Sequence, residues 1–160
     1  MENNKILGIK SNQYITAYII AFVLSTIVAV IMFLPVLRVE FADYWPYLTT
    51  SIIFIIFDII LIVLFFNFIK RPVNLIEVDN HNLILNRSKN ESIVIPFEKL
   101  VDSTISFTFF GIFVHNSGSI VIKTTDNKKY RVGYLNDYVK ISGQINSIKF
   151  IEKIGGKLWK

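Results

Sequence analysis

The sequence predicts a membrane-spanning α-helical hairpin of two transmembrane helices, followed by a small α+β domain of about seven antiparallel strands and a C-terminal helix. Three observations lead to this fold class. Two long apolar runs fill most of the first 70 residues, short β-rich runs separated by turn residues follow them, and residues 136–156 have helical periodicity. A helix needs ~20 mostly apolar residues to cross the ~30 Å hydrocarbon core of a bilayer, and both apolar runs exceed that length.

The first apolar run covers residues 14–37, and no charge occurs between Lys10 and Arg38. It is longer than the ~7–15-residue apolar core of a secretory signal peptide, so we expect a retained helix. The second run covers residues 46–69 and contains a single charge, Asp58. Residues 1–71 are therefore assigned to a short polar N-terminal arm and the hairpin, and residues 72–160 to the second domain.

The distribution of positive charge predicts the orientation of the hairpin. Cytoplasmic loops of membrane proteins carry an excess of Lys and Arg. The connection between the two runs, residues 38–45, contains Arg38 alone, whereas the terminal side carries Lys5, Lys10, Lys70, Arg71, Arg87 and Lys89. We expect a multi-pass protein of the cell membrane with both termini in the cytoplasm.

The pattern after Pro72 is typical of an antiparallel β domain closed by a helix. In its last β-rich run, Tyr130 and Val132 alternate with Lys129 and Arg131, so one face is expected to be buried. The expected strands are residues 73–78, 83–86, 92–95, 100–107, 109–114, 119–125 and 129–135.

A helical stripe follows these strands. We expect Asn136 to be the N-cap of this helix and Gly155 with Gly156 to end it. The stripe, which is expected to plug the open mouth of the curved sheet, consists of Ile141, Ile145, Ile148 and Ile151.

Four stretches between Pro72 and Ile151 carry a family resemblance. They are Asn74–Val78 with Leu83–Leu85, the Ile-Pro step at Ile95–Leu100, Gly118–Thr124 with Asn127–Tyr130, and Tyr134–Asp137 leading into the helix. In these stretches the chain resembles the bacterial pleckstrin-homology-like (bPH) domains. Two helices before such a domain are also a layout of that family.

This resemblance implies a role that is not enzymatic. Small basic two-helix proteins with this domain resemble the self-immunity proteins made by bacteria that produce leaderless bacteriocins, which are cationic, membrane-active peptides. The resemblance therefore implies bacteriocin immunity, a form of antimicrobial resistance. Other members of the family are envelope proteins of unknown role, so a scaffold or regulatory subunit of an envelope complex is the alternative.

Asp58 is the one residue of the apolar runs that breaks their pattern. An Asp at the middle of a bilayer costs ~2.5–3.5 kcal/mol on insertion scales and should face protein or water. Ser25 and Thr26 lie at a similar depth in the first run and can form a hydrogen bond with it. Asp58 is either a hydrogen-bonded clamp between the helices, or a proton or cation site, an oligomer contact or a contact to a partner peptide. The proton or cation reading implies a third function, an oligomeric transporter.

The positive charge of the protein lies in its second domain. Residues 70–160 carry fourteen Lys and Arg against eight Asp and Glu, and Lys123, Lys128, Lys129 and Arg131 are expected to form a membrane-surface basic patch. Pleckstrin-type lipid binding usually relies on basic residues in the first hairpin loop, but here residues 79–82 contain none. The expected partners are the anionic inner leaflet, a cationic antimicrobial peptide and a second copy of the chain, but no nucleic acid.

No catalytic or cofactor-binding pattern is present in the sequence. It has no Cys, no Gly-rich phosphate loop, no nucleophile elbow and no metal-ligand spacing. His81 and His115 are expected in turns, as solvated polar residues. We therefore expect no enzyme activity, cofactor or metal. Four aromatic residues around Gly111 are expected in the core and barrel rim, or as an apolar surface that meets the bilayer or a peptide: Phe107, Phe109, Phe110 and Phe113.

Overall fold

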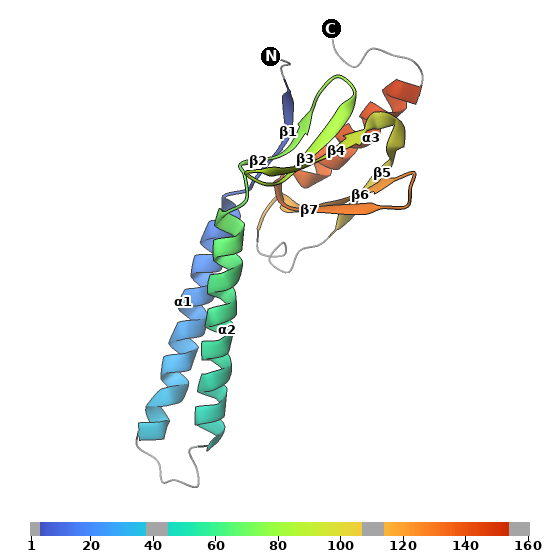
Figure 1. Ribbon diagram of the computed structural model, residues 1–160. Coiled ribbons are helices and arrows are strands. Elements are labelled where there is room, and N and C mark those ends of the chain that lie inside the picture. Colours follow the sequence, from blue (N-terminus) through green and yellow to red (C-terminus); the bar gives the residue numbers. More distant parts are fainter. Residues whose placement is uncertain (1–3, 38–44, 107–113, 154–160) are drawn as a thin grey trace. The chain divides into compact units, whose positions relative to one another are not determined.

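The structure is a computed structural model of the chain, and it describes residues 4–37, 45–106 and 114–153, with the side chains of the last helix described to Ile148 (Figure 1). The chain divides into two units. The hairpin unit consists of residues 15–69, and the β unit consists of residues 1–14 together with residues 70–160.

The hairpin unit contains two long apolar helices, as the sequence predicted. Helix α1 covers Gln13–Phe33 and continues into a 3₁₀ turn, η1, at Leu34–Leu37. Helix α2 covers Trp45–Ile69. Both segments are long and apolar enough to cross a membrane. In each segment, 11% of the most apolar stretch is buried inside the protein. Most of the surface of both helices is therefore exposed.

The two helices pack in an antiparallel pair through a narrow seam. In α2 the seam residues recur at alternating intervals of three and four, which is the spacing of a coiled-coil face: Ser51, Phe54, Asp58, Leu61, Phe65 and Phe68. The facing side of α1 is rich in small residues, with Ala21, Ser25 and Ala29. The Ser51 hydroxyl donates to the Ala29 carbonyl across this seam at 3.1 Å.

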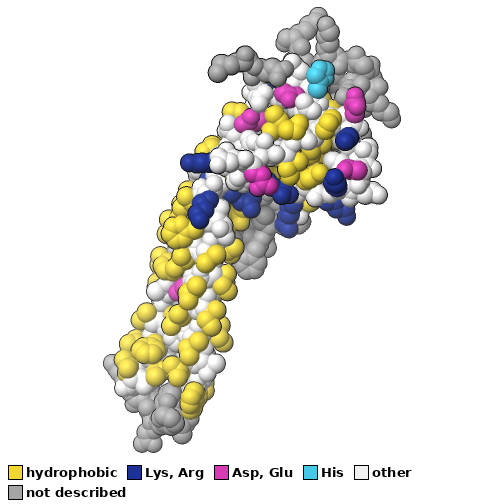
Figure 2. Space-filling view, in the orientation of Figure 1, with side chains coloured by type: hydrophobic (Ala, Val, Ile, Leu, Met, Phe, Trp, Pro, Cys, Tyr) yellow, Lys and Arg dark blue, Asp and Glu magenta, His cyan; other side chains and the backbone are white. Residues whose placement is uncertain are grey.

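The outer surface of the hairpin unit is apolar around the seam. Figure 2 shows hydrophobic side chains covering its visible face. Leu24 and Ile53 are each 59% exposed, and many other Ile, Val and Leu side chains are exposed to a similar degree. A surface of this composition suits lipid rather than water.

The first sheet of the β unit contains a strand that the sequence analysis missed. Strand β1, Lys5–Ile9, lies in the segment that was expected to be a polar arm. It pairs with β2, Asn74–Val78, in a sheet that continues through β3, Asn82–Ser88, and β4, Glu91–Pro96. A Cβ atom at Gly8 would lie 2.9 Å from Leu135 Cδ2 and 3.1 Å from Ile76 Cβ, so a larger residue there would require these side chains to shift.

The second sheet has three antiparallel strands in sequence order. They are β5, Leu100–Ser106, β6, Ser117–Thr124, and β7, Lys129–Asn136, and the short helix η2, Phe97–Lys99, leads into β5. The described residues contain seven strands, six after residue 72 and β1 before the hairpin. The expected strand at residues 109–114 lies almost entirely outside the described residues.

Helix α3, Tyr138–Lys153, closes the β unit as expected, but it begins later than the sequence suggested. Asn136 is the last residue of β7 rather than the N-cap. Asp137 has a φ of 50°, and its carbonyl accepts the Ile141 N–H at 3.0 Å. Asp137 therefore makes the turn from strand to helix. The expected end of the helix at Gly155 lies outside the described residues.

The isoleucine stripe of α3 enters the core as predicted. Ile141, Ile145 and Ile148 are 3%, 0% and 4% exposed, whereas the side chain of Ile151 lies outside the described residues. Both sheets contribute to the same core, whose members from the strands and η2 are Leu75, Ile76, Val78, Leu83, Leu85, Ile95, Phe97, Leu100, Ile120, Ile122, Val132 and Leu135.

Candidate functional site

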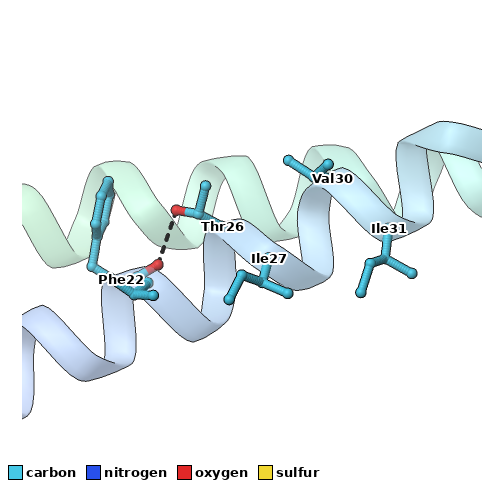
Figure 3. Close-up of a pocket in the computed structure, with 6 residues that line it drawn as sticks. Phe22, Thr26, Ile27, Val30 and Ile31 are labelled. Atoms are coloured by element: carbon cyan, nitrogen blue, oxygen red, sulfur yellow. Dashed lines mark hydrogen bonds between the residues drawn. The ribbon is translucent and has the colours of Figure 1, made fainter.

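The polar centre of the hairpin unit joins α1 to α2 through Thr26 and Asp58. The Thr26 hydroxyl lies 3.0 Å from Asp58 Oδ2 and 2.9 Å from the Phe22 carbonyl. Figure 3 shows the second of these contacts within the turn of α1. Of the two partners expected for Asp58, Thr26 is therefore the one that forms a hydrogen bond with it.

The second expected partner, Ser25, does not bind Asp58. Ser25 is 5% exposed, and neither its hydroxyl nor Asp58 Oδ1 has a hydrogen-bond partner in the described part of the chain. The Thr26 hydroxyl carries one hydrogen but faces two acceptors. The Phe22 carbonyl and the Asp58 carboxyl therefore compete for this hydrogen.

The exposed face of α1 beside Thr26 carries an apolar groove of about 320 Å³. Its lining side chains include two rows spaced four residues apart, Phe22, Thr26 and Val30 in one and Ile27 and Ile31 in the other (Figure 3), and Val23 also lines it. Such rows are the ridges that a neighbouring helix meets when it packs. Thr26 is the single polar side chain in the groove.

Three of the four expected basic-patch residues lie on one face of the second sheet. Lys123 is opposite Lys129, and Val121 is opposite Arg131. Ile120 and Ile122, which alternate with Val121 and Lys123 along β6, point into the core. Lys128 lies in the turn between the strands. The register therefore brings Lys123, Lys129 and Arg131 together, as expected.

Two acidic residues reduce the charge of this basic face. Lys123 Nζ lies 3.5 Å from Asp102 Oδ2, and Lys128 Nζ lies 3.2 Å from Asp126 Oδ2. Hydrogen bonds from Thr124 and then Lys128 lower the pKa of Asp126, and the bond to Asp126 raises the pKa of Lys128. All four side chains are well exposed, so these pairs contribute little stability. They do lower the attraction of this face for anions.

The first hairpin loop is organised by Asp79. Its carboxylate accepts the backbone N–H groups of His81 at 2.8 Å and Asn82 at 2.6 Å, and also the Asn82 side-chain amide at 3.0 Å. Burial acts to raise the pKa of Asp79, but these hydrogen bonds hold it below its usual value. The loop is thus a tight turn held by the Asp79 carboxylate. Residues 79–82 contain no Lys or Arg that could bind a phosphate.

A cluster around Tyr134, which the sequence analysis missed, joins three parts of the β unit. The guanidinium of Arg71 lies over the Tyr134 ring, 4.9 Å from its centroid, and the Tyr14 ring meets Tyr134 edge-on at 4.9 Å. Lys10 Nζ donates to the Arg71 carbonyl at 2.9 Å. The Ser11 N–H donates to the Tyr134 carbonyl at 2.8 Å. We call Lys10, Ser11, Tyr14, Arg71 and Tyr134 the junction cluster.

The backbone of Tyr134 is strained. Its φ is 65°, a value that glycine adopts easily but that is an outlier for a bulky side chain. The neighbouring Gly133 was the one sequence signal of an irregular strand here. Strain of this kind persists only where surrounding contacts enforce it, and it concentrates at functional positions.

No group of acidic or histidine side chains that could hold a metal ion occurs in residues 4–37, 45–106 and 114–153. His81 and His115 are exposed, as expected for turn residues. The four aromatic residues around Gly111 that were expected in the core or at a surface, Phe107, Phe109, Phe110 and Phe113, lie outside the described residues.

Comparison of the whole chain with protein-family models, with curated protein sequences and with solved structures found no match in any of the three.

Proposed function

We propose that the protein is a non-enzymatic membrane protein whose helices α1 and α2 cross the bilayer as a hairpin. The observation that carries this proposal is the small buried share of both helices, 11% of the most apolar window of each. The core helix of a soluble protein would be mostly buried. An apolar surface that extends over two 25-residue segments also exceeds the patches of ~300–600 Å² typical of soluble monomers.

The pairing of β1 with β2 supports a hairpin whose two ends lie on one side of the membrane. Strand β1 precedes α1 and strand β2 follows α2, and the Lys10 N–H donates to the Val73 carbonyl at 2.8 Å. Two chain segments that are hydrogen-bonded to each other cannot lie on opposite faces of a bilayer. Together with the charge asymmetry of the sequence, this supports cytoplasmic termini.

The biological role we propose is protection of the cell membrane from a cationic, membrane-active bacteriocin, with the β unit acting as a bPH-like domain. Two antiparallel sheets closed by a terminal helix agree with that domain in general shape only. The hairpin would hold the β unit at the inner leaflet. There its basic face would compete with the peptide for anionic lipid, or the hairpin would bind the peptide itself.

The test is a resistance measurement. The full chain is expressed in a sensitive bacterium, and the inhibitory concentrations of a panel of leaderless bacteriocins are compared with those for an empty-vector strain. An antibiotic that acts on the ribosome serves as the control. A raised inhibitory concentration for at least one bacteriocin, with no change for the antibiotic, supports the role. No shift for any peptide, with membrane expression confirmed, contradicts it.

A second candidate is an oligomeric proton- or cation-coupled transporter that uses Asp58. One observation favours it, namely that Asp58 Oδ1 and the Ser25 hydroxyl are buried without a hydrogen-bond partner among the described residues. Buried polar groups in a membrane are costly and are often functional. Proton flux into liposomes that contain the purified protein, compared with liposomes that contain Asp58→Asn, tests this candidate.

A further inference from the structure

The junction cluster brings two cations together from opposite ends of the hairpin sequence. Lys10 precedes α1 and Arg71 follows α2. The Lys10 ammonium lies within hydrogen-bond distance of the Arg71 backbone, at 2.9 Å from its carbonyl. Burial and then the positive charge of Arg71 lower the pKa of Lys10. Two like charges are therefore held close together in a partly buried place, where an anion would be attracted to both.

The guanidinium of Arg71 is well prepared to bind such an anion. It lies over the ring of Tyr134, with its carbon 4.9 Å from the ring centroid. This cation–π contact restrains the guanidinium against the ring. A planar fork of donors fits two oxygens of a phosphate at once. Arg71 makes no side-chain hydrogen bond or ion pair with any residue in the described part of the chain.

The ring that supports Arg71 is held at the cost of backbone strain. Tyr134 keeps its φ of 65° while the Ser11 N–H binds its carbonyl and the completely buried Tyr14 packs edge-on against its ring. Enforced strain at a residue that presents a side chain to a ligand is a recognised property of binding sites.

The position of the cluster along the chain indicates where the anion comes from. Lys10 lies three residues before Gln13, where α1 begins, and Arg71 lies two residues after Ile69, where α2 ends. The ends of a membrane-spanning helix lie at the level of the lipid headgroups. A phosphate at that level belongs to a phospholipid.

We propose that Lys10 and Arg71, with Arg71 supported by Tyr134, form a binding site for the phosphate of an anionic phospholipid. This site rests on the proposed insertion of α1 and α2 into a membrane, but not on protection from a bacteriocin. It differs from the first hairpin loop, which is closed by Asp79, and from the outer face of β6 and β7, where acidic residues pair with two of the lysines.

The test is native mass spectrometry of the full chain in detergent micelles, titrated with phosphatidylglycerol or with phosphatidylcholine. We expect preferential binding of phosphatidylglycerol, and a loss of ~10-fold or more in affinity for Arg71→Gln, because this change removes charged hydrogen bonds to the phosphate. Arg71→Lys keeps the charge but not the planar fork, so its affinity should be intermediate. The matched control is Arg87→Gln with Lys89→Gln, which removes two exposed charges at the turn between β3 and β4 and should leave the affinity unchanged.

Two further measurements make the result decisive. Tyr134→Phe keeps the supporting ring and should lose less affinity than Tyr134→Leu, which removes it, and circular dichroism melts identify any variant that has not folded. Inorganic phosphate at the same concentrations should not displace the lipid. The site is disproved if Arg71→Gln and Arg71→Lys both fold and bind normally, if the control variant loses as much affinity, or if inorganic phosphate competes equally. A protein that purifies without detergent would instead contradict the proposed membrane function.

Discussion

Asn146 makes both of the backbone hydrogen bonds that a neighbouring strand would make to Ser103. Its Oδ1 accepts the Ser103 N–H at 2.8 Å, and its Nδ2 donates to the Ser103 carbonyl at 3.0 Å. Ser103 lies in β5, the edge strand of the second sheet, and Ser142, one helical turn earlier, donates to the same carbonyl at 3.0 Å. Helix α3 thus covers a sheet edge through side chains and fixes its own register against β5.

The first prediction concerns this contact. Asn146→Leu should lower the free energy of unfolding by ~1–2 kcal/mol, because it leaves the Ser103 N–H without a partner and the Ser103 carbonyl with Ser142 alone. Asn146→Asp keeps the acceptor and should cost less. Circular dichroism melts of the full chain in detergent micelles measure both. The neighbouring Ser147→Ala, whose hydroxyl binds only its own helix, should melt as the parent protein does, and a parent-like melt for Asn146→Leu would contradict the role of the contact.

The second prediction concerns the isoleucine stripe. Ile145→Asn with Ile148→Asn should unfold the β unit, because each change removes ~2–5 kcal/mol of core packing from a total stability of ~5–15 kcal/mol. Val139→Asn on the same helix is the control, since Val139 is 57% exposed. Tryptic digestion followed over time reports unfolding. Equal resistance of the double variant and the control to the protease would show that the stripe does not hold the core together.

The third prediction separates a structural Asp58 from a functional one. If Asp58 is a clamp, Asp58→Asn should keep stability and protection, because an amide can still bind Thr26, and Thr26→Val should cost ~0.6–2 kcal/mol. If Asp58 carries a proton or a cation, Asp58→Asn should abolish function while the protein still folds. Ser25→Ala should be neutral if Asp58 is a clamp, because Ser25 does not bind Asp58. Expression level and bacteriocin protection are measured, and a stable, active Asp58→Leu would exclude both roles.

The fourth prediction is a pH dependence from Asp79. Because the pKa of Asp79 is lowered in the folded state, its contribution to stability is present above the unfolded pKa of ~3.9 and is lost as the pH falls through the folded value. The melting temperature of the parent protein should therefore fall more steeply below about pH 4 than that of Asp79→Asn. Thermal melts between neutral and acid pH measure the difference, and parallel curves would count against it.

The fifth prediction is the topology. The chain has no Cys, so single cysteines can be introduced at Asn3, Asp43 and Lys160 without competing thiols. In intact cells an impermeant thiol reagent should label the cysteine at position 43 and leave the two terminal positions unlabelled. Labels at the termini with a silent position 43 would reverse the orientation, and all three positions should react in opened cells.

The sequence predicted those parts of the fold that depend on strong, periodic patterns. The two apolar runs predicted α1 and α2 to within a few residues, the isoleucine spacing identified the buried face of α3, and residues 79–82 were expected as a turn. Each depends on interactions close in sequence or on simple burial, so a single chain is enough to recognise it.

The parts that were missed depend on contacts that are distant in sequence. Strand β1 is short and contains Gly8, so its pattern alone is weak, and its partner β2 lies beyond both helices. The choice of Thr26 over Ser25 depends on the rotation of α1 about its own axis. The positive φ of Tyr134 follows from Ser11, Tyr14 and Arg71, none of which is near it in sequence.

The pairing of β1 with β2 also sets the order in which the protein can be assembled during synthesis. Strand β1 is translated first, and the 64 residues from Lys10 to Val73 must follow before its partner exists. At ~5–20 residues per second the ribosome needs roughly 3–13 s for that interval. The first sheet is therefore completed only after both helices have left the ribosome. Until then Ile6 and Ile9 lie on an unpaired strand, so a newly made chain with a delayed second helix is exposed to aggregation and to proteases at its N-terminus.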